Sequence, residues 1–269
     1  MALTLTPRMK QRRRRTQLGS QADKSAGPFP ASRRGDGRAA IRRPDLTAEL
    51  KAKRYPNMRP RDAATLLVLD TSGPTPKLLM GQRHHGLKFM PGKFVFPGGR
   101  VEPQDYLASV GTRMSAPIRA KLLRHLSGSP HPQRAHAMVH AALRETQEET
   151  GIVVGKGARI GDREGTADFE GFALLARAIT PAGRPRRFDT RFFVVSADRI
   201  TQRTAIVDGE FITVEWFTIP EARQQDLPSI TRMILEDLDA RICAGGVADP
   251  HAPVPFYFMR GACFHRRLL

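Results

Sequence analysis

Cysteine is scarce in this 269-residue chain, and long apolar runs are absent. The two cysteines, Cys243 and Cys263, are too few for a disulfide framework or a zinc site, so we expect both as reduced thiols. No apolar run approaches the roughly 20 residues that span a bilayer, and the first residues lack the apolar core of a signal peptide. These absences exclude a secreted disulfide scaffold and a membrane-spanning helix, and they predict a soluble cytoplasmic protein.

Acidic residues are also few, with 26 Asp and Glu against 44 Lys and Arg and a net charge of +18. The excess is concentrated in residues 1–60, which contain 16 basic and 4 acidic residues and therefore +12 of the total. This region has no apolar periodicity, so we expect residues 1–58 to form a disordered basic arm. Such an arm could bind nucleic acid or an anionic membrane, could be a solvated tail, or could follow from a misplaced start codon.

The rest of the chain mixes strand and helix patterns. Apolar alternation and bounding turns predict strands at residues 63–69, 77–80, 93–96, 172–179, 188–196 and 210–217. Apolar residues at helical spacing predict helices at residues 135–149 and 229–242, and another helix begins at Pro220. Gly151 stands where the first of these helices should end. The pattern favours an α/β domain.

A split motif carries the chemistry. Its first half is Gly98–Asp105, and its second half, Arg144–Ile152, contains three carboxylates. Residues three and four apart share a helix face, so Glu145 lies beside Glu148 and Glu149, where like charges repel. Clustered oxygens suit hard cations such as Mg²⁺, which are bound by a few carboxylates together with substrate phosphates. The motif therefore predicts a metal site that acts on a phosphate compound.

These residues resemble the Nudix box of the Nudix hydrolases, with Gly99, Asp105 and the series Arg-Glu-x-x-Glu-Glu-x-Gly from Arg144 to Gly151. The resemblance implies an α/β/α sandwich with a mixed central sheet. It also implies Mg²⁺ or Mn²⁺ as cofactor, with the metal held by the Gly99 carbonyl, Glu145, Glu148 and Glu149. Arg144 would orient Glu148 from one helical turn away.

The two halves of the motif are separated by Tyr106–Leu143, which is 38 residues and much longer than the spacer of the family pattern. A helix is expected at residues 117–126 within it. The insertion, with Leu78-Leu79, Arg83 and Phe96–Gly99, resembles one branch of the family, the peroxisomal-type coenzyme A diphosphatases of mammals and their bacterial relatives. Met90 replaces the histidine usual in that signature. We expect the Nudix domain at 59–245 with the insertion at about 106–136, and a C-terminal extension at 246–269 packing on it.

The resemblance implies hydrolysis of a diphosphate linkage in a nucleoside diphosphate derivative, foremost coenzyme A or acyl-coenzyme A. Alternatives are a hydrolase of another nucleotide (dinucleotide, ADP-sugar or nucleoside triphosphate), a nucleic-acid-associated protein recruited by the basic arm, and a catalytically silent binding module. The candidate catalytic residues are Glu148, Glu149, Arg144 and Glu210, and the candidate substrate-binding residues are Arg83, Arg187 and Arg191. The general base is a box glutamate or a distal acid, and of Glu210 and Glu215 the first is favoured. Oligomeric state is not indicated by the sequence.

Overall fold

The computed structural model describes residues 39–40, 55–107, 113–126, 128, 130–155, 169, 171–207, 209–260 and 263–269. All of them belong to one unit of the chain, Asp36–Leu269. The expected disordered arm, residues 1–58, lies outside the described residues except for 39–40 and 55–58. Residues 39–40 form a short strand, so this part of the arm joins the fold.

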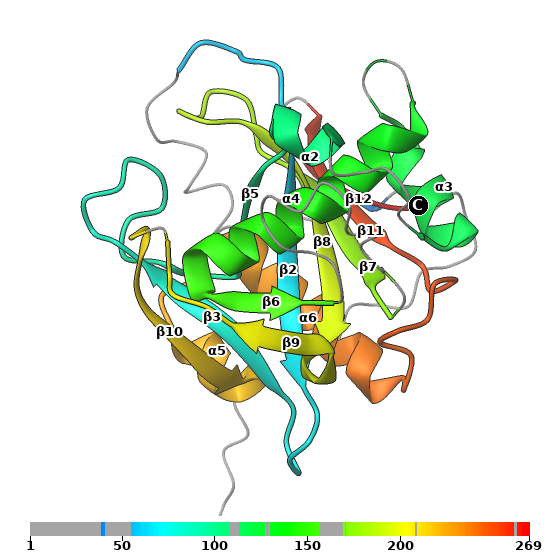
Figure 1. The fold of residues 1–269 in the computed structure, drawn as a ribbon. Coiled ribbons are helices and arrows are strands. Elements are labelled where there is room, and N and C mark those ends of the chain that lie inside the picture. Colours follow the sequence, from blue (N-terminus) through cyan, green and yellow to red (C-terminus); the bar gives the residue numbers. More distant parts are fainter. Residues whose placement is uncertain are drawn as a thin grey trace, which may run out of the picture. The chain divides into compact units, whose positions relative to one another are not determined.

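A mixed sheet is the centre of the fold (Figure 1), and within the described residues it has ten strands. They are β1 (Ala39–Ala40), β2 (Arg61–Asp70), β3 (Lys77–Arg83), β4 (Phe94–Val95), β5 (Gly98–Arg100), β7 (Ala173–Ile179), β8 (Phe188–Ser196), β10 (Phe211–Thr218), β11 (Pro255–Arg260) and β12 (Cys263–Leu268). The order is β1-β12-β11-β7-β8-β2-β3-β10, with β4 paired to β3 and β5 to β2. The pairs β2–β8 and β11–β7 are parallel, and the other pairs are antiparallel.

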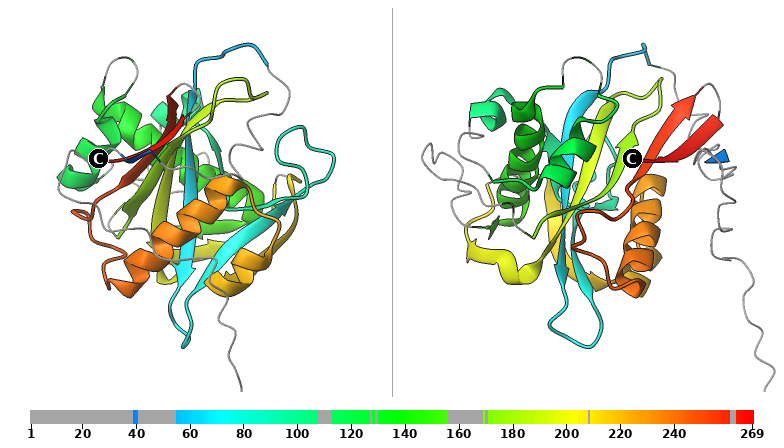
Figure 2. Two further views of the ribbon diagram at one scale, coloured as in Figure 1. Left: turned by 180° about the vertical axis from the view of Figure 1, so that it is seen from behind. Right: turned by 90° about the vertical axis from the view of Figure 1, so that its right-hand side faces the viewer.

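Both faces of the sheet are buried, as the alternation along β2 illustrates. Leu66 and Val68 face one core, which includes α3 (Ala116–Leu123) and α4 (Pro132–Thr150). Leu67 and Leu69 face a second core, which includes α5 (Ile219–Gln224) and α6 (Ser229–Cys243). Successive side chains of a strand point to opposite faces, so one strand serves both layers. Figure 2 shows α4 and α6 on opposite sides of the sheet, which confirms the predicted α/β/α sandwich.

Helix α4 begins and ends where its terminal residues require. The His131 side chain accepts a hydrogen bond from the Gln133 amide. Pro132, which precedes the helix expected at 135–149, is the first helical residue, a position that suits proline. Gly151 ends the helix in the left-handed conformation with φ of 69°. A side chain there would also approach the Thr204 carbonyl oxygen to 2.3 Å. Because the helix ends at Gly151, Glu145, Glu148 and Glu149 all lie in its last turns.

The described part of the insertion packs in the core on the side of the sheet that carries α4. Its helix α3 buries Ile118 and Leu122 in the core beneath α4. Lys121 Nζ donates to the carbonyl oxygens of Pro250 and Ala252 at 2.8 and 2.7 Å. Arg177 of β7 donates to the carbonyls of the residues that follow α3. The described part of the insertion is therefore attached to the C-terminal region.

Two regions contain strands that were not expected from the sequence. A second, two-stranded sheet pairs β6 (Ile152–Val154) with β9 (Ile200–Arg203). The C-terminal segment, expected as an extension that packs on the domain, forms β11 and β12 of the central sheet. Within the described part of the chain, no helix is both long and apolar enough to cross a membrane.

Candidate active site

Arg144 is the centre of the acidic end of α4. Its Nη1 donates to Glu145 Oε1 and Glu148 Oε2, both at 2.9 Å. Its Nε and Nη2 donate to the two carboxylate oxygens of Asp105 at 3.0 and 3.2 Å, and Nη2 also donates to the Arg100 carbonyl at 3.1 Å. One guanidinium therefore orients two box glutamates and joins α4 to the first half of the motif.

Asp105 has a structural place in this arrangement. It lies in the short helix α2 (Pro103–Leu107), is only 2% exposed, and accepts a hydrogen bond from the Glu102 amide at 2.7 Å. Its carboxylate thus fixes the start of α2 and pairs with Arg144 at the same time. The buried pair closes the loop that contains the insertion.

The glycines of β5 allow the strand to approach α4. A Cβ atom on Gly99 would lie 2.3 Å from the carboxylate carbon of Glu145. A Cβ atom on Gly98 would lie 2.5 Å from the Ala64 carbonyl oxygen, and its φ of +154° is unfavourable for other residues. The Gly98 amide donates to Glu149 Oε2 at 2.9 Å. Both glycines are therefore required by close contacts.

Burial perturbs the acids of this wall. It raises the pKa of Glu145 to about 7, although the neighbouring Arg144 opposes the shift. Burial also raises the pKa of Glu149 well above its usual range, against the hydrogen bond from Gly98. For Arg144 burial lowers the pKa, but the Asp105 hydrogen bond and the surrounding carboxylates outweigh it and raise the pKa overall. Buried carboxylates of this kind are stabilised in their charged form by a nearby cation.

A second ion pair, between Arg83 and Glu210, lines the same pocket as the acids of α4. Arg83, at the end of β3, donates to Glu210 Oε2 at 2.8 Å and to the Phe89 carbonyl at 3.1 Å. The Glu210 carbonyl accepts from the His84 amide at 2.8 Å. Glu215, the other distal acid considered from the sequence, is exposed on β10 and lies outside the pocket described next.

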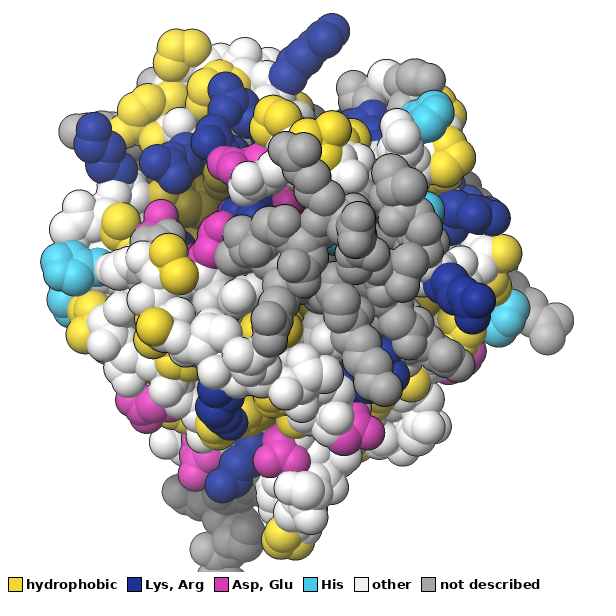
Figure 3. All heavy atoms as spheres, viewed as in Figure 1, with side chains coloured by type: hydrophobic (Ala, Val, Ile, Leu, Met, Phe, Trp, Pro, Cys, Tyr) yellow, Lys and Arg dark blue, Asp and Glu magenta, His cyan; other side chains and the backbone are white. Residues whose placement is uncertain are grey.

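The acids line a pocket of about 1390 Å³. Gly98, Gly99 and the three box glutamates form one wall, and Glu210 with Arg83 also borders it. The other wall comes from residues 58–61, from the loop after β3 and from the loop between β7 and β8. Figure 3 shows Lys and Arg side chains along the upper edge of a hollow at the upper left, with acidic side chains beside it. Acidic and basic walls therefore share one cavity.

The sequence-predicted arginines have different positions. Arg83 and Arg187 line the pocket, but Arg191 does not. Arg191 has no exposed surface; its Nη1 donates to Asp62 and contacts Asp189, and burial lowers its pKa to about 10. Its role is thus to pair with buried acids, and it is removed from the candidate substrate contacts.

Two pocket segments were missed from the sequence. Residues 55–58 were assigned to the arm, but Met58 lines the pocket together with Arg59 and Pro60, the first residues of the expected domain. Phe89 lines it as well and packs edge-to-face on Phe188, with ring centroids 5.8 Å apart. The composition of the arm could have indicated the first segment, because residues 55–58 contain no basic residue and interrupt the basic run.

The donor set fits a hard divalent cation. Three carboxylates of α4 and the backbone of Gly99 line one wall, and two of the carboxylates are buried with raised pKa values. Such oxygens suit Mg²⁺ or Mn²⁺. Among the described residues, no three His, Cys, Asp or Glu side chains stand in a preformed metal-binding group. Arg144 and the Gly98 amide donate hydrogen bonds to carboxylate oxygens of this wall.

Comparison with known proteins identifies the domain. Residues 131–238 match the family model of the NUDIX domain, whereas no curated protein matches the chain. A NUDIX hydrolase from Alicyclobacillus acidocaldarius has 23% identity and a TM-score of 0.51, covering 66% of this chain and 90% of that one. Two further solved structures have TM-scores below 0.5 and are given only as similar chains.

They are the NUDIX domain of Shewanella oneidensis NrtR complexed with ADP ribose (14% identity, TM-score 0.44, 72% and 97% covered) and a MutT NUDIX hydrolase from Burkholderia pseudomallei (16%, 0.40, 67% and 99%). The matched range of the family model begins at His131, the N-cap residue of α4 and near the end of the expected insertion, and it contains the second half of the motif. The contact of Asp105 with Arg144 brings the first half beside it. Residues 131–238 of this chain are therefore identified as a NUDIX domain, and the fold is the Nudix α/β fold.

Proposed function

We propose that this chain hydrolyses the diphosphate linkage of a nucleoside diphosphate derivative, foremost coenzyme A or an acyl-coenzyme A. The resemblance to the Nudix hydrolases implies cleavage of a diphosphate linkage in a nucleotide derivative, and residues 131–238 match the NUDIX domain model. The observation that carries the proposal is the single pocket with three α4 carboxylates on one wall and a basic wall facing them. An acidic wall can hold cations over the reacting phosphates, while a basic wall can bind the remaining anionic groups of the substrate.

The metal would be Mg²⁺ or Mn²⁺, held by Glu145, Glu148, Glu149 and the Gly99 carbonyl. Bound there, the ion would neutralise the phosphate oxygens and activate water. Arg144 keeps Glu145 and Glu148 oriented toward the pocket through its two Nη1 hydrogen bonds. The Gly98 amide fixes Glu149 in the same way.

Glu210 is the proposed distal acid that orients or deprotonates the attacking water. It lines the pocket, and Arg83 holds its carboxylate at 2.8 Å while the His84 amide fixes its backbone. A box glutamate is the alternative base. Glu215 lies outside the pocket and is therefore a matched control for changes at an acid of the same type.

Pocket volume supports a large substrate. At about 1390 Å³ the pocket exceeds the roughly 300 to 1,000 Å³ usual for small-molecule sites. Aromatic side chains, Phe89 and Phe188, offer a surface for a base or an acyl portion. A dinucleotide, an ADP-sugar or a nucleoside triphosphate remains the alternative substrate. The basic arm, on which a nucleic-acid role would depend, lies outside the described residues apart from 39–40 and 55–58.

A substrate panel tests the proposal. Purified protein is incubated with coenzyme A, acetyl-coenzyme A, NAD, ADP-ribose and ATP, with Mg²⁺, Mn²⁺ or a chelator, and products are separated by chromatography. We expect metal-dependent cleavage of coenzyme A and its acyl derivative. Glu148→Gln should lower the rate by roughly 100-fold or more, because a proposed metal ligand is lost.

Glu215→Gln is the control and should leave the rate unchanged, since this residue is exposed and outside the pocket. Metal-independent turnover, or equal rates for Glu148→Gln and the wild type, would contradict the proposed mechanism. Cleavage of ADP-ribose or NAD in preference to coenzyme A would keep the mechanism and replace the substrate.

A further inference from the structure

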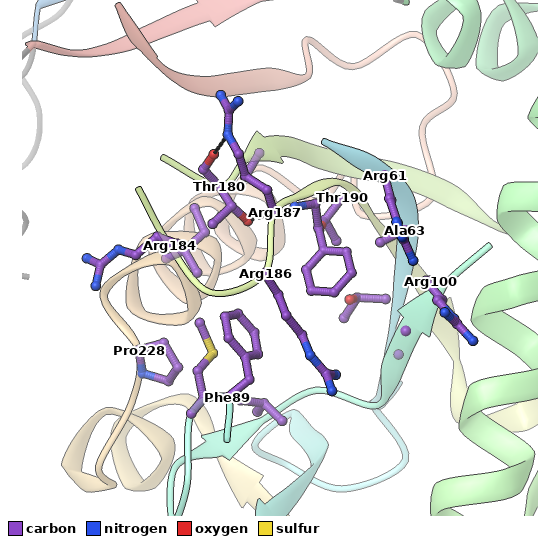
Figure 4. Close-up of a pocket in the computed structure, with 18 of the residues that line it drawn as sticks. Arg61, Ala63, Phe89, Arg100, Thr180, Arg184, Arg186, Arg187, Thr190 and Pro228 are labelled. Atoms are coloured by element: carbon purple, nitrogen blue, oxygen red, sulfur yellow. Dashed lines mark hydrogen bonds between the residues drawn. The ribbon is translucent and has the colours of Figure 1, made fainter. Parts of the chain in front are cut away.

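Three arginines lie close together in the loop between β7 and β8, and their side chains take different directions (Figure 4). Arg187 points to the strand end: its Nε donates to the Thr180 carbonyl at 3.0 Å. Its Nη1 donates to Asn57 Oδ1 at 2.9 Å and to the Met58 carbonyl at 2.8 Å. Arg187 thus links Asn57 and Met58 to the loop, and its guanidinium donates its hydrogen bonds within the protein.

Arg186 takes the opposite direction. In Figure 4 its side chain extends across the pocket, between Phe89 and Arg100. Arg184 also borders the pocket, but its side chain points outward from the loop. Arg186 is exposed and forms no hydrogen bond or ion pair with a residue that the structure describes. Of the three arginines, it is the one placed to meet a molecule in the pocket.

Two other basic residues line the same side of the pocket. Arg61 begins β2 and Lys88 lies in the loop after β3, and neither side chain forms an ion pair within the described part of the chain. Arg100 differs, because its guanidinium pairs with Glu102 at 2.8 Å. The charges of Arg61, Lys88 and Arg186 are therefore balanced by no protein carboxylate there, and they favour an anion.

We propose that Arg186 binds a phosphate monoester that the substrate carries in addition to its diphosphate, and that it thereby determines substrate specificity. The inference rests on the proposed function and names the substrate class more closely, as a nucleotide with a third phosphate outside the scissile linkage. A guanidinium forms two parallel hydrogen bonds to phosphate, which gives directional selectivity. The acids of α4 occupy the other wall, so the diphosphate and the extra phosphate are bound by separate groups.

Paired substrates that differ by one phosphate test this directly. We would measure kcat and KM for coenzyme A and 3′-dephospho-coenzyme A with the wild type, Arg186→Ala, Arg186→Lys and Arg184→Ala. The wild type should prefer coenzyme A. Arg186→Ala should lower kcat/KM for coenzyme A by about 10- to 100-fold, mainly through KM, and leave the dephospho compound nearly unchanged. Arg186→Lys should keep part of the preference for coenzyme A, because lysine retains the positive charge but cannot form two parallel hydrogen bonds to phosphate.

Arg184→Ala removes the same charge from the same loop and should keep the preference. Equal use of both substrates by the wild type, an equal loss on both substrates in Arg186→Ala, or the same change in Arg184→Ala would overturn the proposal. A binding measurement separates it from the proposed function. Calorimetry with adenosine 3′,5′-bisphosphate and with AMP needs no turnover, and Arg186→Ala should weaken only the first.

If neither substrate is hydrolysed, the proposed function fails, and calorimetry still decides the role of Arg186. Equal affinity of the wild type for adenosine 3′,5′-bisphosphate and AMP would then reject the phosphate subsite.

Discussion

The two walls of the pocket are built in different ways. On the acidic wall, Glu145, Glu148 and Glu149 come from one helix, and each accepts a hydrogen bond from Arg144 or Gly98. The basic wall is assembled from three separate segments, with Arg61, Lys88 and Arg186 exposed. A wall fixed by internal hydrogen bonds suits chemistry that tolerates little displacement. A wall with unpaired charges on loops suits recognition of a variable part of the substrate.

Gly99→Ala, which displaces an acid of the acidic wall, should have the largest effect on activity. The new Cβ would meet the Glu145 carboxylate, which is the end of a flexible side chain, so the fold should persist while the acid moves. We expect kcat to fall by roughly 100-fold with little change in KM, because a small misplacement at a reacting centre is costly. Steady-state kinetics and thermal melting together measure the two effects.

Gly98→Ala is the companion variant. Its Cβ would meet the Ala64 carbonyl and the Thr65 backbone, which cannot move aside as a side chain can. This change should lower the melting temperature as well as the activity. If both variants lost stability equally, the separation of catalytic and structural glycines would be wrong.

Removal of residues 55–60 should damage the basic wall with a smaller effect. A chain that lacks residues 1–60 loses Met58, Arg59 and Pro60 from the pocket, while one that lacks 1–54 keeps them. We expect the shorter chain to show a KM about 10-fold higher for coenzyme A at similar kcat, since binding contacts but no catalytic groups are lost.

Arg187→Ala should have the same direction of effect as this deletion, because it releases Asn57 and Met58. An unchanged KM in both the deletion and Arg187→Ala would show that the segment contributes nothing to binding.

Metal addition should give the smallest effect and should act on one wall only. If Mg²⁺ binds the folded acidic wall, saturating ion should raise the melting temperature by on the order of 4 °C. The chain without residues 1–60 should show the same rise, whereas Glu148→Gln should lose most of it. A rise of equal size in Glu148→Gln would place the metal elsewhere.

The acidic wall could be predicted from the sequence, and the basic wall largely could not. The spacing of Glu145, Glu148 and Glu149 is set by a helix, which is a local structure with a fixed period. The contact of Asp105 with Arg144 spans the intervening 38 residues and was not predicted, since the resemblance only implied that Arg144 orients Glu148. The ends of the motif are local as well, since Gly151 takes the expected left-handed conformation.

The basic wall depends on contacts between distant segments. Arg187 is held by Asn57 and the Met58 carbonyl, which are distant in sequence. Arg191 was wrongly expected in this wall because its contact with Asp62 also joins distant residues. The C-terminal strand β11 was missed for the same reason, because it joins the sheet in parallel with β7 across many residues. The insertion, taken from the sequence as a clue to the substrate, contributes no described residue to the pocket.

The ion pair between Asp105 and Arg144 also determines what the chain between them can become. Because this buried pair holds the two ends of the connection together, its length can change without moving the box, and each doubling of a flexible loop costs only about 0.6 kcal/mol in closure entropy. The length and sequence of the connection between the two halves of the motif can therefore change in evolution while the residues of the acidic wall stay in place.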